Sequence, residues 1–290
     1  MLVSTLNVRF ALCLAAGILG AGAASAAEPM VSESWLATQL HNPHVVVLDL
    51  RPAAAYLEGH IPGAVSADFS TTGWMAPEPG GAAGALPPVE RIAATIGTLG
   101  VGNDDQAVIV ADAFPAAARV YWTFKVLGHA EVSILDGGAR GWTEPVERGP
   151  VTREPAVFTA HYTDSLRAGL PEVAAAVAGG GTKLVDARSM SQWNGAVRSP
   201  AVRAGGHLPG AVSLDQAAAL TADGRLKSRN ELALLFAPAG TMPAIVYCNV
   251  GYLSATDWFV LSEVLRRPGV KLYDGSMSEW TADPSRPVEQ

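Results

Sequence analysis

The chain has 290 residues, of which 49% are apolar and 16% are charged, so it can bury a sizeable core and is neither disordered nor fibrous. Lys and Arg number 20 against 27 Asp and Glu, giving a formal net charge of −7. No basic cluster offsets this acidity, which argues against nucleic acid as a partner, because phosphate binding requires concentrated positive charge.

Residues 1–27 have the pattern of a cleaved signal peptide. Arg9 is the positive residue at the start, Phe10 to Gly22 form an apolar run, and small residues at 24–26 favour cleavage after Ala26 or Ala27. A membrane anchor is the alternative, but the run is shorter than the roughly 20 residues that span a bilayer. We therefore expect a periplasmic or secreted protein with no membrane partner after cleavage.

Short apolar runs alternate with amphipathic ones along the rest of the chain. Strands are predicted at Val45 to Leu50, Ala107 to Val110, Ser133 to Leu135, Lys183 to Ala187, Ala244 to Tyr247 and Val270 to Tyr273. Helices are predicted at Pro171 to Ala178, Asn230 to Phe236 and Ser254 to Arg267. This alternation favours an α/β fold with open, mostly parallel sheets covered by helices on both faces, in which ligands bind at the carboxyl ends of the strands.

Three sequence signatures occur twice, in the same order. Leu-Asp-Leu-Arg at 48–51 and Gly-His-Ile-Pro-Gly-Ala at 59–64 return as Val-Asp-Ala-Arg at 185–188 and Gly-His-Leu-Pro-Gly-Ala at 206–211. The stretch ending in Leu-Asp-Gly-Gly, with Trp142, returns 138 residues later as a stretch ending in Tyr-Asp-Gly-Ser, with Trp280. We infer two homologous domains, 28–142 and 164–290, each with its own core, joined by a proline-containing linker at 143–163.

The chain contains two cysteines, and removal of the leader takes Cys13 with it. Cys248 is then a solitary thiol in an oxidising compartment. No Cys-x-x-Cys pair or metal-binding histidine spacing is present in the sequence, so we expect no structural zinc.

Cys248 follows a predicted strand and precedes a predicted helix, whose start we place at Ser254 with Asp257 as a capping box. The amide groups and the positive dipole end of such a turn stabilise a thiolate, so Cys248 is the candidate nucleophile. An inert buried cysteine is the alternative. Alignment through Val108 places Asp112 at the matching point of the first copy, which therefore cannot do thiolate chemistry.

These motifs together resemble the rhodanese-type sulfurtransferases built from two tandem rhodanese domains, over about residues 32–280. They comprise Asp-x-Arg and Gly-His-[Ile/Leu]-Pro-Gly-Ala in each half, the loop Tyr-Cys-Asn-Val-Gly-Tyr-Leu-Ser at 247–254, and Asp-Gly-[Gly/Ser] near each domain's end. Family members typically pair an inactive first domain with a catalytic second one, in agreement with the single thiol.

The resemblance implies that sulfur moves from an anionic donor to Cys248 as a persulfide, and then to cyanide, a small thiol or a thiol protein, without any metal or organic cofactor. The loop amides would serve as the anion hole. The substrate-binding residues implied by the motif are Arg188, Asn249, Val250, Gly251, Tyr252, Leu253 and Ser254.

Several of these residues also have a plain structural interpretation. Arg188 could form an ion pair with Asp186, as Arg51 could with Asp49 in the first copy. Arg198 and Arg203, in the ten-residue extension of the second copy, are weaker candidates and read as solvated loop residues. His60 and His207 both lie in Gly-His-x-Pro-Gly turns, and Trp142 and Trp280 are predicted to pack in the core.

The loop departs from the patterns common among thiosulfate-using and mercaptopyruvate-using family members. Asn249 and Val250 are neutral where the former carry cations, Cys-Gly-[Ser/Ala]-Gly is absent, and Asn194 precedes Gly195 where the family often has Arg. The donor is therefore open. A rhodanese-fold sulfur carrier without turnover is the alternative function. The phosphatases that share this fold need an Arg after five intervening residues, where Ser254 stands.

Overall fold

The computed structural model describes residues 27–75 and 83–290. The signal-peptide prediction for residues 1–27 lies outside these residues except for Ala27. Within the described part of the chain, no helix is long and apolar enough to cross a membrane.

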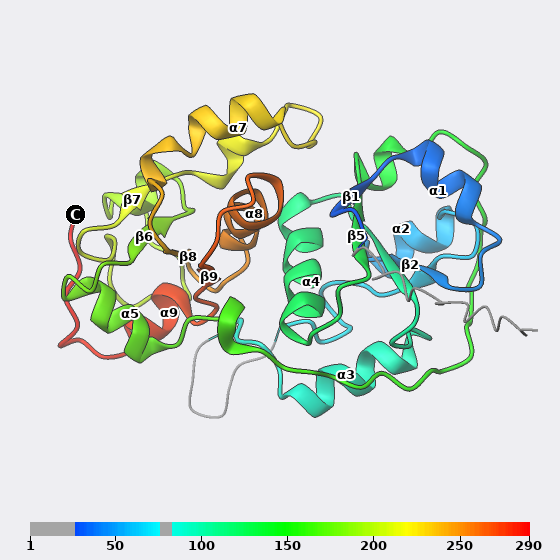
Figure 1. Cartoon of the computed structure of the whole chain (residues 1–290), viewed down its shortest axis with the longest axis horizontal. Coiled ribbons are helices and arrows are strands. Elements are labelled where there is room, and N and C mark those ends of the chain that lie inside the picture. Colours follow the sequence, from blue (N-terminus) through cyan, green and yellow to red (C-terminus); the bar gives the residue numbers. More distant parts are fainter. Residues whose placement is uncertain (1–26, 76–82) are drawn as a thin grey trace, which may run out of the picture.

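Two α/β units lie side by side, with the first half of the chain in one and the second half in the other (Figure 1). The helices are α1 (Glu33–Gln39), α2 (Ala53–Glu58), α3 (Val89–Thr98), α4 (Phe114–Val126), α5 (Leu170–Val177), α6 (Met190–Trp193), α7 (Arg229–Leu235), α8 (Ser254–Phe259) and α9 (Ser276–Trp280). The strands are β1 (Met30–Val31), β2 (Val45–Asp49), β3 (Val65–Ser66), β4 (Gln106–Val110), β5 (Val132–Leu135), β6 (Lys183–Asp186), β7 (Val212–Ser213), β8 (Ala244–Tyr247) and β9 (Val270–Leu272).

The predicted strands are found to within about a residue at each end, as are the helices at α5 and α7. The predicted helix from Ser254 to Arg267 is different, because its α-helical part ends at Phe259. A π-helical turn, Val260–Val264, continues it.

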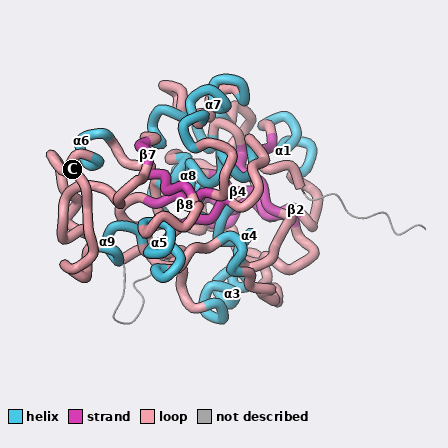
Figure 2. The backbone as a smooth tube through the Cα atoms, turned by 60° about the vertical axis from the view of Figure 1, so that its left-hand side comes forward, coloured by secondary structure: helices cyan, strands magenta, loops and turns pink. Residues whose placement is uncertain are grey.

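Each unit contains one parallel sheet. The strand order is β1-β5-β4-β2-β3 in the first unit and β7-β6-β8-β9 in the second. The backbone of Arg167 forms a parallel bridge to Leu272 where β1 would lie, so the two sheets share one order. Figure 2 shows the strands at the centre of the molecule with helices around them. The expected fold of two open parallel sheets covered on both faces is confirmed.

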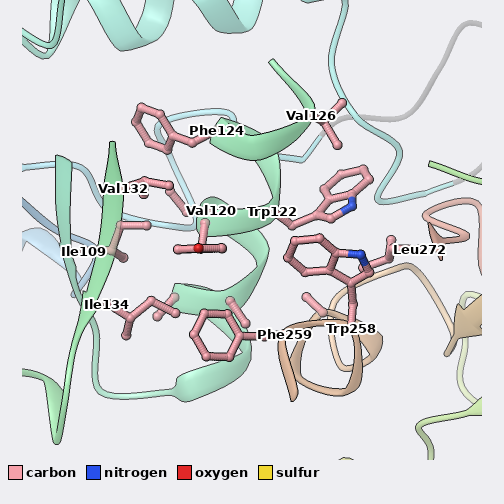
Figure 3. Packing of buried hydrophobic residues seen from close by; sticks show 14 of the residues in the cluster. Ile109, Val120, Trp122, Phe124, Val126, Val132, Ile134, Trp258, Phe259 and Leu272 are labelled. Atoms are coloured by element: carbon pink, nitrogen blue, oxygen red, sulfur yellow. The ribbon is translucent and has the colours of Figure 1, made fainter. Parts of the chain in front are cut away.

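The hydrophobic core differs from the prediction of one separate core for each copy. The outer face of each sheet has a small core of its own, but the inner faces share a single cluster that includes Ile109 and Val246. Helices α4 and α8 lie against each other inside this cluster, where Trp122 of α4 lies near Trp258 of α8 (Figure 3) and Tyr121 packs on Phe259 with ring centroids 4.9 Å apart. Because α4 is buried nearly all round, neither unit can close its inner core alone.

The predicted linker, 143–163, runs along the first unit. Phe158 is buried in the shared core, and the N–H groups of His161 and Thr163 donate to the carbonyls of Leu127 and Val126. These contacts hold the connection against the end of α4, and they help to fix the second unit relative to the first.

Candidate functional site

Cys248 lies directly after β8 and has no exposed surface. The turn that follows it leads into α8, at the carboxyl end of the parallel sheet where ligands of such folds bind. Among the described residues it is the free cysteine. The predicted position of Cys248, between a strand and a helix N-terminus, is thus what the structure shows.

Ser276 holds this turn together. Its hydroxyl oxygen accepts hydrogen bonds from the N–H groups of Cys248 (3.1 Å) and Gly251 (3.0 Å), and the hydroxyl donates to the carbonyl of Tyr273 (2.7 Å). Ser276 has a φ of 51°, a left-handed conformation that is uncommon outside glycine. Because this backbone conformation is unfavourable for serine, the three hydrogen bonds of its hydroxyl are the structural reason for a serine at this position.

The capping-box prediction for α8 is wrong. The residue that caps α8 is Leu253, which already has helical backbone angles and gives no side-chain hydrogen bond to the helix. Because the turn enters the helix in helical geometry, Ser254 and Asp257 face the interior. The Ser254 hydroxyl donates a hydrogen bond to the sulfur of Cys248 at 3.5 Å. Ser254 is therefore in direct contact with the thiol.

Asp257 is fully buried on the same helix, and neither carboxylate oxygen has a hydrogen-bond partner among the described residues. Burial raises its pKa well above the usual range, and the negative charge of a Cys248 thiolate adds to the shift. The Asp257 side chain is therefore neutral over a wider pH range than an exposed aspartate. While Asp257 is protonated, it has no negative charge that would oppose ionisation of the Cys248 thiol.

The remaining residues of the loop contact either the first unit or the segment that follows β6 in the second unit. Asn249 donates to Gln192 (3.3 Å), and Tyr252 packs on Phe69 of the first unit with ring centroids 5.4 Å apart. The backbone of Val250 is so close to Gly84 that a Cβ on this glycine would lie 2.2 Å from the Val250 carbonyl oxygen. The first unit therefore packs against one side of the Cys248 loop.

Arg188 is 2% exposed and forms the ion pair that was the structural alternative for it. Its Nε and Nη2 donate to the carboxylate of Asp186, and Nη2 also donates to the Gly206 carbonyl at 2.8 Å. Nη1 points toward the loop, 3.4 Å from the side-chain oxygen of Asn249. One edge of the guanidinium is thus committed to structure, and the other borders the candidate site.

The weaker candidates lie apart from this arrangement. Arg198 and Arg203 are exposed, and Arg198 donates to the carbonyl of Val202. His60 and His207 are buried against the carbonyls of Tyr56 and Trp193. These contacts agree with the structural interpretation of all four.

The strand register corrects the alignment of the two copies. The Val110 carbonyl accepts from Leu50 as the Tyr247 carbonyl accepts from Ala187, so Ala111, and not Asp112, corresponds to Cys248. The conclusion that the first copy has no thiol at this point is unaffected.

Sequence reasoning missed Arg119 as well as Ser276. Arg119 lies on α4 of the first unit, is fully buried, and donates from Nη1 to the Gly251 carbonyl of the Cys248 loop at 3.0 Å. A charged residue in the middle of a mostly apolar helix was the available signal. For Ser276 the signal was the change from Gly138 to serine between the two copies.

The residues that the structure describes contain no group of three or more side chains able to hold a metal ion. The arrangement consists of a buried thiol beside a hydroxyl donor, on a turn whose amides and carbonyls are fixed from both units. A thiol in this setting can act as a nucleophile on small molecules.

Comparison with known proteins agrees with the two-unit fold. The rhodanese-like domain model matches residues 32–145 and again 170–283. A protein of Mycolicibacterium smegmatis, named "Putative thiosulfate sulfurtransferase", is 34% identical over 285 residues, covering 90% of this chain and 98% of that protein. The sulfur carrier protein TtuD of Thermus thermophilus is 35% identical over 281 residues, covering 87% and 93%.

Among solved structures, the 3-mercaptopyruvate sulfurtransferase SseA of Escherichia coli matches with a TM-score of 0.75 and 29% identity. The match covers 86% of this chain and 99% of SseA. Together with the domain matches in both halves, these similarities establish that the chain belongs to the rhodanese family, with one rhodanese-like domain in each half.

Proposed function

We propose that this protein is a sulfurtransferase that moves a sulfane sulfur from a small anionic donor, through a persulfide on Cys248, to cyanide or a thiol. The observation that carries the proposal is the placement of Cys248 on the clamped turn between β8 and α8. The names of the relatives, thiosulfate sulfurtransferase and 3-mercaptopyruvate sulfurtransferase, favour the same chemistry.

With thiosulfate as donor, the Cys248 thiolate attacks the outer sulfur. A bond forms between the two sulfurs, the original sulfur–sulfur bond breaks, and sulfite leaves with the electron pair. Cyanide then attacks the outer sulfur of the persulfide, giving thiocyanate and restoring the thiolate. No other oxidant or reductant is needed, because each step exchanges one bond to the transferred sulfur for another.

We assign two groups to the binding of the donor. The Nη1 edge of Arg188 and the amide of Asn249 border the loop, and their N–H groups suit an oxyanion such as a sulfonate or a carboxylate. The Ser254 hydroxyl donates to the sulfur and would stabilise the negative charge on thiolate and persulfide. Thiosulfate is the first donor to test, and 3-mercaptopyruvate is the second.

The alternative is a sulfur carrier, which would accept sulfur on Cys248 without efficient turnover. The neutral loop side chains and the similarity to a protein named a sulfur carrier favour this possibility. Steady-state thiocyanate production with excess donor and cyanide separates the two. We expect many equivalents of thiocyanate per protein, whereas release that stops after one equivalent would identify a carrier.

We also propose, from the leader sequence alone, that the reaction takes place outside the cytoplasm. The expected result is a native protein whose N-terminus is Ala27 or Glu28, measured by intact mass after isolation from the producing cell. Recovery of the chain with its first 26 residues in place would contradict the proposed export.

A further inference from the structure

The Cys248 loop has no positive charge of its own, since residues 249–254 are all neutral. Thiolate and persulfide anions in a buried site require compensating charge or hydrogen-bond donors. Arg188 is already paired with Asp186, so its charge is largely compensated. The other buried guanidinium in contact with this loop belongs to Arg119, on α4 of the first domain.

Arg119 reaches the loop across the domain boundary. Nη1 donates to the Gly251 carbonyl, and Nη2 donates at 3.0 Å to the Gly84 carbonyl of its own domain. Its Nε is buried without a hydrogen-bond partner in the described part of the chain. Both acceptors are neutral carbonyls, so the hydrogen bonds orient this cation without cancelling its charge.

The charges around Arg119 can be compared directly. Burial lowers its pKa from 12.5 to about 10, opposed by the negative charges of Asp274 and Cys248, so it stays protonated at neutral pH. Asp274 is shared with Arg167, whose Nε donates to it at 2.9 Å, and with the N–H of Leu86 (2.7 Å). Asp274 therefore lies near both Arg119 and Arg167, and Cys248, when ionised, is a further negative charge that acts on Arg119.

The negative groups on the other side do not alter this comparison. Asp257, on α8, is a buried acid whose pKa is raised, and Asp186 is paired with Arg188. Tyr252 is neutral, since burial raises its pKa. None of these three side chains therefore forms an ion pair with Arg119.

Arg119 also constrains the backbone of the loop. Gly251 has a φ of 71°, and a Cβ at this position would lie 2.7 Å from Nη1 of Arg119 and 2.6 Å from the Cα of Asp274. The Gly251 carbonyl is held by Arg119 while its N–H is held by Ser276. The peptide groups of the turn are therefore fixed from one side by the first domain and from the other by the second.

We propose that Arg119, a residue of the non-catalytic domain, is a positioning residue for the Cys248 loop that supplies the buried positive charge the loop itself lacks. The first domain then completes the active site of the second, in addition to covering it. The inference deepens the proposed function, because it rests on Cys248 being the reacting group.

The test compares Arg119→Gln and Arg119→Lys with the unmodified full chain. Cys248 is alkylated with iodoacetamide across a range of pH, and modification is followed on the Cys248 peptide by mass spectrometry. Arg153→Gln is the matched control, because Arg153 also donates to two main-chain carbonyls, those of Gly100 and Pro43, in the first domain. Circular dichroism and thermal unfolding establish that each variant is folded.

Removing the charge in Arg119→Gln should move the midpoint of the alkylation profile upward by about one pH unit. The alkylation rate well below the midpoint should fall about tenfold, because it follows the thiolate fraction. Arg119→Lys should keep most of the wild-type profile, and Arg153→Gln should keep all of it. If Arg119→Gln does not fold, Arg119→Met takes its place beside the lysine variant.

A folded neutral variant with the wild-type midpoint would overturn the proposal and reduce Arg119 to a contact between domains. An equal shift in the lysine and glutamine variants would also contradict it, because charge would then not be the cause. Alkylation does not require sulfur transfer, so a protein that takes up no sulfur would refute the proposed function and leave this result valid.

Discussion

The two halves of the molecule share the same framework, but among the described residues only the second has a thiol at the turn after its central strand. Arg51 donates to the carboxylate of Asp49 in the first domain as Arg188 does to that of Asp186 in the second. In each case the guanidinium also donates to the carbonyl of the glycine that begins the Gly-His motif. Because the first domain has this ion pair but no thiol at the matching turn, the ion pair has a structural role that is independent of sulfur chemistry.

The histidines of the two Gly-His motifs also have similar surroundings in the two halves. His60 stacks on Tyr56 with ring centroids 3.9 Å apart, and His207 stacks on Trp193 at 3.5 Å. The backbone of His60 pairs with Glu147, just after the first domain, and that of His207 pairs with Glu289, at the end of the second. These residues close their domains, which explains why the most visible motifs of the sequence lie outside the candidate site.

The differences between the halves lie at the turn after the central strand. Ala111 of the first domain corresponds to Cys248, and Gly138 corresponds to Ser276. Both Gly138 and Ser276 have positive φ, 56° and 51° respectively. Ser276 therefore has an unfavourable positive φ at a position where the first domain has glycine. Its hydroxyl forms the hydrogen bonds that hold the Cys248 turn.

The largest expected effect on activity comes from removing the thiol from the second domain or placing it in the first. Cys248→Ser should abolish sulfur uptake and thiocyanate formation while the protein stays folded, because no other thiol lies on the turn. The double variant Ala111→Cys with Cys248→Ser should remain inactive, because the first domain lacks the serine that organises the turn. Thiocyanate production measures both, and activity of either variant would contradict the assignment.

Breaking the repeated ion pair should mainly affect stability. Arg188→Ala leaves the buried Asp186 uncompensated, and we expect a loss of about 3–5 kcal/mol in the free energy of unfolding. Arg51→Ala should cost less, because the side chain of Arg51 is 14% exposed. Urea denaturation measures the two losses. If Arg188 also binds the donor, the KM for donor rises in Arg188→Ala alone, and an unchanged KM would restrict Arg188 to structure.

Exchanging the glycine and the serine should destabilise both domains. In Gly138→Ser the new Cβ would lie 1.9 Å from the Ala111 carbonyl oxygen, and relieving this contact should cost about 1–3 kcal/mol. Ser276→Gly removes three hydrogen bonds but relieves the positive φ, so its net cost should be smaller. Slower sulfur uptake is expected only in Ser276→Gly, and equal rates in the two variants would argue against the clamp.

The buried acid of the second domain should give the smallest effect, one that depends on pH. The pKa of Asp257 is raised in the folded protein, so its favourable contribution is complete below the ordinary value of 3.8 and is lost as pH rises toward the raised value. Asp257→Asn removes this loss, so its melting temperature should exceed that of the wild type at pH 8 and approach it near pH 4. A difference that is independent of pH would show that Asp257 is not titrating.

Much of this framework was predictable from the sequence, because its signals are local. The parallel strands are short apolar runs, the repeats reveal the two domains, and Cys248 is found from the strand, turn and helix around it. The helix start at Ser254 was mispredicted for a physical reason. A Ser-x-x-Asp pattern fits a capping box, but here both side chains are turned inward by a loop that is already helical at Leu253.

The contribution of the first domain could not be read from either half alone. Arg119 and Gly251 are distant in sequence and meet only because α4 and α8 share one core. A local pattern predicts that α4 is buried, but it does not identify the partner of a charged residue within it. The one-residue error that placed Asp112 opposite Cys248 has a similar origin, since the register follows from hydrogen bonds between strands.

The most direct test of the account is the intact mass of the mature protein after incubation with thiosulfate, 3-mercaptopyruvate or polysulfide, before and after cyanide is added. We predict the gain of one sulfur atom, located on the Cys248 peptide and removed by cyanide, with the fastest donor identifying the substrate. No gain with any donor, or a gain that persists in Cys248→Ser, would contradict the central claim that the second domain transfers sulfur through Cys248.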